Sequence, residues 1–245
     1  MFAADAARCI TRSDIRLDRG LVARYTMDNI SGNSLVDEMG TYDGVIYDSP
    51  VFEPGVIGNC VSFINNPGYL YDFGMAGQLF DAISFFLFIP DKQYQSKVDM
   101  IGNLSTHAGV LAVGQPTTLL PRETFLAFSV FPEGSTNAFK YYYCKGDVEP
   151  GWHHVVIQWE QDRYVFHLDN TRLFSTWYSS GAGFPERLLD LEYFALGMRP
   201  LGLAKARCKV DEVWIYDRGG EGLSAGEIDA LYKEGASSIT PHVGG

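Results

Sequence analysis

The sequence predicts an all-β protein in which two antiparallel sheets stack as a sandwich, with one short helix near the C-terminus. Two observations carry this prediction. Clusters of Gly, Pro, Asn and Asp that favour turns recur about every eight to fifteen residues. The stretches between these clusters are rich in β-branched and aromatic residues, which favour strands. This spacing is typical of a sandwich and does not fit the alternation of strands with long helices that builds a parallel sheet.

The predicted strands form one continuous domain. They lie at 20–27, 60–64, 82–89, 124–131, 139–144, 153–159, 164–169, 193–198 and 209–216. No internal repeat and no linker interrupts them, so we expect a single domain at 20–236. Residues 1–19 have a different, Arg- and Asp-rich pattern and are expected to form an N-terminal arm, and residues 237–245 a C-terminal tail.

The predicted helix covers residues 223–235. Ser224 and Glu227 have the S-x-x-E spacing of a capping box at its start. Ile228 and Leu231 lie three apart on one face, which predicts an apolar stripe that docks on the sandwich. Gly235 stands where a left-handed glycine commonly ends a helix.

Composition excludes several classes of function. The chain of 245 residues is 46% hydrophobic, enough for a full core, and carries a net charge of −11. An acidic surface repels phosphate backbones and anionic lipids, so we expect neither nucleic acid nor a membrane as partner. There is no apolar run of ~18 residues. The start lacks a basic segment followed by an apolar one, so no signal peptide is visible.

The four cysteines are widely spaced and include no C-x-x-C pair. They are Cys9, Cys60, Cys144 and Cys208. This spacing argues against a zinc or thioredoxin-like site. We expect small, buried, reduced thiols, although the sequence does not exclude disulfide pairing among the four.

The stretch "GWHHVVIQW" at 151–159 contains two adjacent histidines. Because neighbouring strand residues point to opposite faces, His153 and His154 are not expected to share one metal ion. We expect one of them to lie inside the domain and the other to face outward, as part of a strand and not of a reactive site.

Several segments resemble one family in order. They are "GLVARYTMDN", "LVDEMGTYDGVI", "VIGNCVSFINNPGYLYD", "DAISFFLFIP", "GWHHVVIQWEQDRYVFHLDNTRL" and "KVDEVWIYDRGGEGLSAGEIDALYKEG". Together they resemble the laminin-G-like jelly rolls of the concanavalin A-like lectin/glucanase superfamily over about 20–235. The resemblance implies two curved antiparallel sheets stacked face to face. It does not imply one activity, because one fold hosts many functions.

The enzymes of this superfamily carry an E-x-D-x-(x)-E strand whose alternate carboxylates act as nucleophile and acid. The stretch "LLDLEYF" places Leu188 at the first carboxylate position, and "WEQDRY" places Tyr164 at the third. Both patterns are incomplete. The sequence therefore predicts that the protein is not an enzyme.

The resemblance also suggests a structural calcium ion. Asp28, Asp37, Asp211 and Glu212 match acidic positions of the family's motifs. In a sandwich the opening and closing strands can lie side by side, so Asp28 and Asp211 could share one ion with backbone carbonyls. The alternative is that Asp211 accepts hydrogen bonds from backbone N–H groups of a loop, without metal.

Aromatic side chains are the candidates for a carbohydrate site. Trp177, Tyr178 and Tyr142 are candidates because sugars are commonly held against an aromatic face, and part of the tyrosine run at 141–143 must face outward. Their alternative place is the core or a subunit interface.

The function predicted from the sequence is a non-enzymatic, lectin-like recognition or structural module. Such modules act outside cells, and the absent export signal leads to a bacteriophage virion protein, namely a decoration, tail or fibre component. Its expected partners are a glycan or cell-surface receptor and neighbouring virion subunits held by arm and tail, in an oligomer or larger assembly. Its expected location is the virion or the extracellular space. The alternatives are a bacterial carbohydrate-binding module and a degenerate glycoside hydrolase.

Overall fold

The computed structural model places most of the strands and the helix in detail. It describes residues 15–64, 68–71, 73–75, 78, 80–90, 98–102, 110–113, 124–130, 139–145, 148–160, 163–173, 176–180, 194–199, 204–205 and 207–236. In several strands from 98 to 205 only the backbone is described. The predicted arm lies largely outside these residues and the tail entirely so, and the proposed division into arm, domain and tail stays a prediction.

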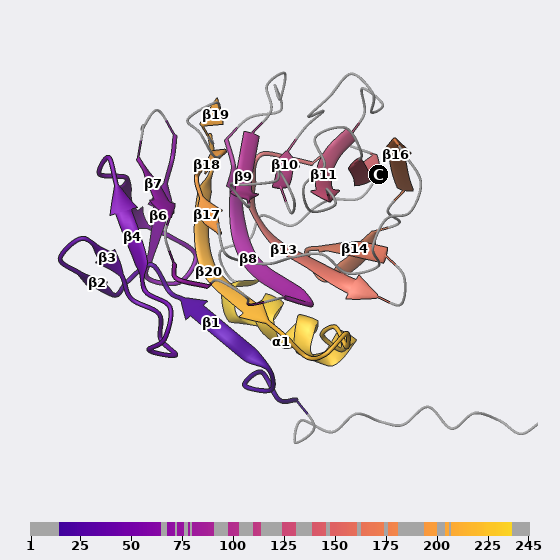
Figure 1. Ribbon diagram of the computed structural model, residues 1–245, viewed down its shortest axis with the longest axis horizontal. Helices are drawn as coiled ribbons and strands as arrows, with labels where there is room; N and C mark the ends of the chain where they lie inside the picture. The colour runs from indigo at the N-terminus through magenta and orange to yellow at the C-terminus, as the bar shows by residue number, and fades with distance from the viewer. Residues whose placement is uncertain are drawn as a thin grey trace, which may run out of the picture.

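Two antiparallel sheets make up the described structure, which confirms the predicted all-β sandwich (Figure 1). The eight-stranded sheet has the order β15-β14-β13-β8-β20-β6-β5, with β1 also paired to β20. Its strands are β1 (Leu21–Tyr25), β5 (Val51–Pro54), β6 (Asn59–Ser62), β8 (Ala82–Ile89), β13 (Gly151–Glu160), β14 (Arg163–Leu168), β15 (Thr171–Leu173) and β20 (Lys209–Tyr216).

The ten-stranded sheet has the order β16-β12-β11-β10-β9-β17-β7-β4-β3-β2. Its strands are β2 (Ile30–Ser31), β3 (Ser34–Leu35), β4 (Gly44–Tyr47), β7 (Tyr69–Tyr71), β9 (Val98–Gly102), β10 (Val110–Val113), β11 (Thr124–Val130), β12 (Phe139–Lys145), β16 (Thr176–Ser180) and β17 (Ala195–Leu196). The short strands β18 (Met198–Arg199) and β19 (Ala204–Lys205) form a separate pair.

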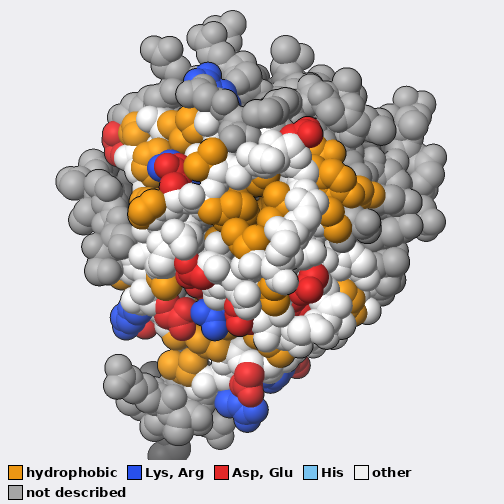
Figure 2. Space-filling model, turned by 90° about the vertical axis from the view of Figure 1, so that its left-hand side faces the viewer, with side chains coloured by type: hydrophobic (Ala, Val, Ile, Leu, Met, Phe, Trp, Pro, Cys, Tyr) orange, Lys and Arg blue, Asp and Glu red, His pale blue; other side chains and the backbone are white. Residues whose placement is uncertain are grey.

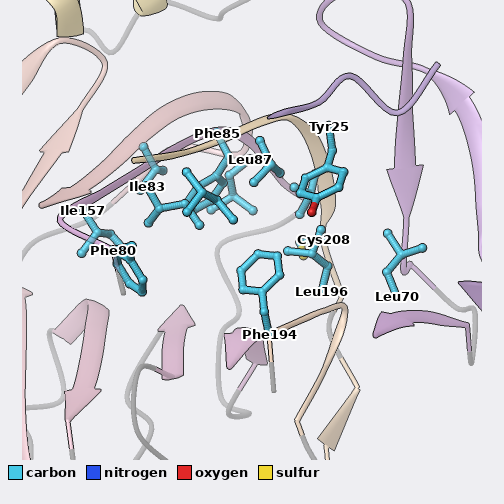
Figure 3. Packing of buried hydrophobic residues seen from close by; sticks show 14 of the residues in the cluster. Tyr25, Leu70, Phe80, Ile83, Phe85, Leu87, Ile157, Phe194, Leu196 and Cys208 are labelled. Carbon is cyan, nitrogen blue, oxygen red and sulfur yellow. The ribbon is translucent and has the colours of Figure 1, made fainter. Parts of the chain in front are cut away.

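The core fills the space between the two sheets. Alternate residues of each strand point into it, as the period of two requires. Figure 3 shows Phe85 and Leu87 from β8 close to Tyr25, with Leu196 and Phe194 approaching from the other sheet. All five are buried. Cys60, Cys144 and Cys208 are free and buried, as predicted, whereas Cys9 lies outside the described residues.

The first and last strands of the domain are neighbours. β1 pairs with β20 in antiparallel register from Leu21 opposite Tyr216 to Tyr25 opposite Val213. β20 pairs with β6 only further along, through Lys209 and Val210. The register of β20 against β8 shifts between Asp211 and Trp214, where Glu212 has a φ of 49°.

The helix α1 (Ala225–Gly235) begins as predicted. Ser224 is the N-cap, and both hydrogen bonds of the capping box with Glu227 are present. The predicted left-handed Gly235 is wrong, because the C-cap is Ala236 in a right-handed conformation. Gly235 instead lets the helix approach the sheet, since a Cβ atom there would collide with Val56 and Phe86.

α1 covers the outer face of the eight-stranded sheet (Figure 1). Its residues Ile228 and Leu231 pack with Trp214 and Tyr216 of β20, and Leu17 from the N-terminal side joins this second cluster. The side chain of Arg218 is 2% exposed and donates to Glu227 at 2.9 Å. This sheet therefore has side chains buried on both of its faces. None of the helical structure in the described residues has the length and hydrophobicity that a membrane crossing requires.

Candidate functional site

Two of the predicted calcium ligands contact the same turn between β5 and β6. Oδ2 of Asp211 accepts hydrogen bonds from the backbone N–H groups of Val56 (2.8 Å) and Ile57 (3.0 Å). Oδ1 of Asp28 accepts the N–H and the side-chain amide of Asn59, both at 2.8 Å. Asp28, in the loop between β1 and β2, and Asp211, in β20, thus hold the same turn. For Asp211 this is the metal-free alternative considered from the sequence.

Asp211 is fully buried, and burial raises its pKa to about 7 despite the N–H groups of Ile57 and Val56, which lower it. The nearby charge of Glu212 adds to the increase. Oδ1 of Asp211 has no hydrogen-bond partner. A carboxyl group in this position carries a proton more readily than an exposed one, because its charge is poorly solvated.

The other two predicted ligands lie elsewhere. Asp37 accepts four backbone N–H groups, including that of Arg24 at 2.9 Å, and so holds the turn that follows it. Glu212 accepts from the guanidinium of Arg24 at 3.1 Å and from the indole of Trp214 at 3.2 Å. These two and Asp211 do not converge.

Within the described residues no group of three or more His, Cys, Asp or Glu side chains is placed to hold a metal ion. The four carboxylates therefore do not fit one calcium site, and the structure assigns no role to such an ion. Calcium binding as such stays a prediction.

Both histidines of the 151–159 strand are buried, each only 1% exposed. His153 binds Asp169 through Nδ1 (2.8 Å) and the carbonyl of Glu149 through Nε2 (2.7 Å). Burial lowers its pKa, but Asp169 and the Glu149 carbonyl outweigh this, so its pKa is raised above the ordinary value. Its two ring nitrogens thus connect β13 to the turn between β14 and β15, through Asp169, and to the loop before β13, through Glu149.

His154 lies on the opposite face, beneath α1. Its Nε2 is 2.8 Å from Oγ of Ser84, and its ring lies near Phe86 and Tyr232. Burial lowers its pKa to about 4, so the ring is neutral at pH 7. The expectation that one histidine faces outward is wrong, because α1 covers the face to which His154 points. The serine–histidine pair is equally enclosed.

Of the three predicted carbohydrate-binding aromatics, the structure describes the side chain of Tyr142 alone. Tyr142 is 3% exposed and packs edge-on against Tyr164 in the core, which removes it from the candidates. Tyr142 and Cys144 are two residues apart on β12 and therefore point to the same face, and both belong to the core cluster. For Trp177 and Tyr178 the structure describes the backbone on β16 and not the side chains, so their role stays a prediction.

A different aromatic group lies on the outer face of the ten-stranded sheet. Tyr47 of β4 stacks on Tyr69 of β7, with ring centroids 5.0 Å apart and planes 9° apart. The ring centroid of Tyr71 lies 6.2 Å from that of Tyr47. All three side chains are half-buried, whereas Ile46 and Leu70 between them face the core. We call Tyr47, Tyr69 and Tyr71 the tyrosine cluster.

The strand pairing places the tyrosine cluster. Tyr47 is directly opposite Tyr69 in the antiparallel pair, and Tyr71 is opposite Val45. Asp48 and Ser49 follow Tyr47 with φ values of 53° and 51°, and both are exposed. Figure 2 views the side of the molecule where β2 to β7 lie and shows groups of hydrophobic side chains, a class that includes tyrosine, with acidic side chains among them.

Asp48 lies within electrostatic reach of the tyrosine cluster. Burial raises the pKa of Tyr69, and the charge of Asp48 raises it further. The cluster therefore combines aromatic rings with a carboxylate at its border. The alternation Tyr-Leu-Tyr at 69–71 was a visible signal for it. The pairing of Tyr69 with Tyr47 could not be predicted from the sequence, because more than twenty residues separate them.

No protein-family model and no curated protein sequence matches this chain. Solved structures do match in fold. Domain 4 of AbnA, a GH43 extracellular arabinanase from Geobacillus stearothermophilus solved in complex with arabinotriose, is similar with a TM-score of 0.61 at 15% identity. The match covers 86% of this chain and 98% of that domain.

Two further matches are to parts of longer chains. A Trypanosoma rangeli sialidase in complex with 2,3-difluoro-KDN has a TM-score of 0.58 at 16% identity, over 87% of this chain and 32% of the sialidase. A botulinum neurotoxin type C structure, described with cell entry that depends on two ganglioside molecules, has a TM-score of 0.60 at 10% identity, over 91% and 53%. This chain thus spans about a third and a half of those two.

These similarities agree with the β-sandwich fold and correct the predicted function. The three similar structures come from an arabinanase, a sialidase and a toxin, and none of the three is a phage component. They contradict the role as a virion structural protein. That prediction rested on the absence of an export signal, which bears on transport and not on the surface of the fold.

Proposed function

We propose that the protein is a glycan-binding domain and that the tyrosine cluster is its binding surface. The observation that carries the proposal is the stacked pair of Tyr47 and Tyr69 on an outer sheet face, half-exposed and bordered by Tyr71. Sugars present apolar C–H faces to aromatic rings and hydroxyl groups to nearby polar atoms. Phenol rings supply both kinds of contact.

The similarities in fold support this proposal. The AbnA domain was solved with a bound arabinotriose, and the neurotoxin is described as depending on gangliosides. Identities of 10–16% carry the fold alone, so the ligand must be argued from the surface of this chain. The ordered segments that resemble laminin-G-like jelly rolls fit the same proposal, and we assign the chain to that group within it.

The alternative origin of the cluster is strand stability. A cross-strand aromatic pair stabilises a sheet by about 0.5–1.5 kcal/mol without any ligand. The two roles differ in what a substitution changes. A stabilising pair alters the melting temperature, whereas a binding surface alters affinity.

A Tyr69→Ala substitution tests the proposal. Binding to a glycan array and to soluble plant and animal polysaccharides is measured first for the unmodified protein, and then for the variant with the best ligand. We expect the variant to lose at least about 10-fold in affinity, because aromatic residues at the centre of a site commonly supply more than 1 kcal/mol. Unchanged affinity, or no binding to any glycan, would overturn the proposal.

Tyr232→Ala is the matched control. Tyr232 is also a half-buried tyrosine, but it lies on α1, against His154. We expect this variant to retain its affinity for the glycan. A hydrolysis assay on the bound polysaccharide accompanies the experiment, since the absence of enzymatic activity stays a prediction.

A further inference from the structure

The chain segment that carries the tyrosine cluster has an unusual charge pattern. From Thr26 to Asp91 the sequence contains no Lys, Arg or His. The same segment contains the acidic residues Asp28, Asp37, Glu38, Asp43, Asp48, Glu53, Asp72, Asp81 and Asp91. It forms every strand from β2 to β8, including the two strands of the cluster.

One acidic residue that directly follows a tyrosine of the cluster in sequence is also coupled to the cluster in space. Asp48 directly follows Tyr47, is exposed, and its charge acts on Tyr69. By contrast, Glu53 is paired with Lys209 at 3.0 Å, so part of its charge is neutralised within the eight-stranded sheet. The border of the cluster thus presents a negative charge where an anionic ligand would need a positive one.

We infer that the tyrosine cluster selects neutral glycans and rejects those that carry carboxylate or sulfate groups. This selectivity rests on the proposed function. Arg is the usual partner of a ligand carboxylate or sulfate, and the segment supplies none. A second negative charge brought within about 5 Å of Asp48 is repelled by about 1 kcal/mol in water and by more where the site excludes solvent.

The ligands of the similar structures differ in charge. Arabinotriose carries no charge, whereas a KDN derivative carries a carboxylate. On charge alone, this chain is suited to the first kind of ligand. The overall net charge of −11 acts in the same direction during encounter.

Affinity electrophoresis tests the inference with three probes, namely arabinan and β-1,4-galactan as neutral polymers and polygalacturonate as an anionic one. We expect retardation by at least one neutral polymer and a dissociation constant for polygalacturonate at least about 5-fold higher. Equal or stronger retardation by polygalacturonate would overturn the inference while leaving glycan binding intact. No retardation by any polymer, confirmed on a glycan array, would overturn both.

An Asp48→Asn variant identifies the group responsible. Asn tolerates the left-handed backbone at this position and removes one charge. We expect the affinity ratio of polygalacturonate to neutral polymer to rise about 5-fold. Glu221→Gln is the matched control, since Glu221 is an exposed carboxylate beside Arg19, outside residues 26–91. An equal rise of the ratio in both variants would show that net charge, and not Asp48, sets the preference, and would contradict the assignment to this site.

Discussion

The outer faces of the two sheets are used in opposite ways. On the eight-stranded sheet, α1 covers His154, Trp214 and Tyr216, and the charged side chains of Arg218 and Glu227 are paired with each other. On the ten-stranded sheet, Tyr47, Tyr69 and Tyr71 remain half-exposed. The aromatic residues of the two outer faces therefore have different roles. Under the helix they stabilise the fold, and on the other sheet they are available to a ligand.

Stability and binding are therefore expected to lie on separate surfaces. Substitutions beneath α1 should change the free energy of unfolding and leave glycan affinity unaltered. Substitutions in the tyrosine cluster should do the reverse. The expected change in stability decreases from Arg218, through the buried acid and the histidine pair, to Tyr47.

Arg218 joins the N-terminal segment to the helix. Its side chain is buried, pairs with Glu227 at 2.9 Å and donates to the carbonyl of Arg19 at 2.8 Å. We expect Arg218→Met to lower the free energy of unfolding by about 3–5 kcal/mol, because it leaves a buried carboxylate with one partner fewer. Urea unfolding measures this. Arg172→Met, which breaks an exposed pair, should cost less than about 1 kcal/mol, and similar losses in both would refute the distinction.

Asp211 should make stability depend on pH. Its folded pKa of about 7 lies above the ordinary value, so its contribution to stability is present at low pH and is lost as pH rises through about 7. Relative to Asp211→Asn, the free energy of unfolding should fall by on the order of 3 kcal/mol between pH 4.5 and pH 8. Urea titrations at several pH values test this. A difference that does not vary with pH would contradict the buried acid.

The pair of His153 and Asp169 should act in a nearby pH range. The folded pKa of His153 is raised, so the pair stabilises the protein below the ordinary histidine pKa and this is lost as pH rises through the folded value. Asp169→Asn should cost about 1.5 kcal/mol at pH 5 and less at pH 8. NMR titration of the ring should show a lower pKa in the variant. An unchanged pKa of His153 in the variant would show that Asp169 does not stabilise the protonated ring.

Tyr47 should contribute little to stability. We expect Tyr47→Leu to lower the free energy of unfolding by less than about 1 kcal/mol, since it removes one cross-strand pair from a half-exposed face. Tyr25→Leu is the contrast, because Tyr25 is fully buried and donates to the carbonyl of Tyr42, and it should cost about 3 kcal/mol. Equal losses would place the tyrosine cluster with the core.

Local patterns predicted much of the fold. The capping box of Ser224 and Glu227 fixes the start of α1. Its two residues are only three positions apart, so the motif can be recognised in the sequence. Strand runs such as 82–89 and 209–216 were found because β-branched and aromatic residues are concentrated there, between clusters of residues that favour turns. In a sandwich the opening and closing strands can lie side by side, as considered from the sequence, and β1 does pair with β20.

Features set by tertiary contacts were not predicted. Sequence does not show which face a helix covers, so one of His153 and His154 was expected to face outward, whereas both are buried. The alternation in β12 left two possible orientations, and only packing against Tyr164 shows that Tyr142 faces inward. Gly235 was expected to be a left-handed glycine that ends the helix, whereas its lack of a side chain allows the close approach of Val56 and Phe86. The tyrosine cluster requires the long-range pairing of β4 with β7.

The pairing of the first strand with the last has a consequence for how such a domain can be combined with others. Arg218 binds the carbonyls of Arg16 and Arg19, so the chain enters beside the start of α1. It leaves at the other end of that helix, about 16 Å away. A unit whose entry and exit lie this close can be inserted into a surface loop of a host protein without separating the loop's ends, and its two ends can be joined for circular permutation.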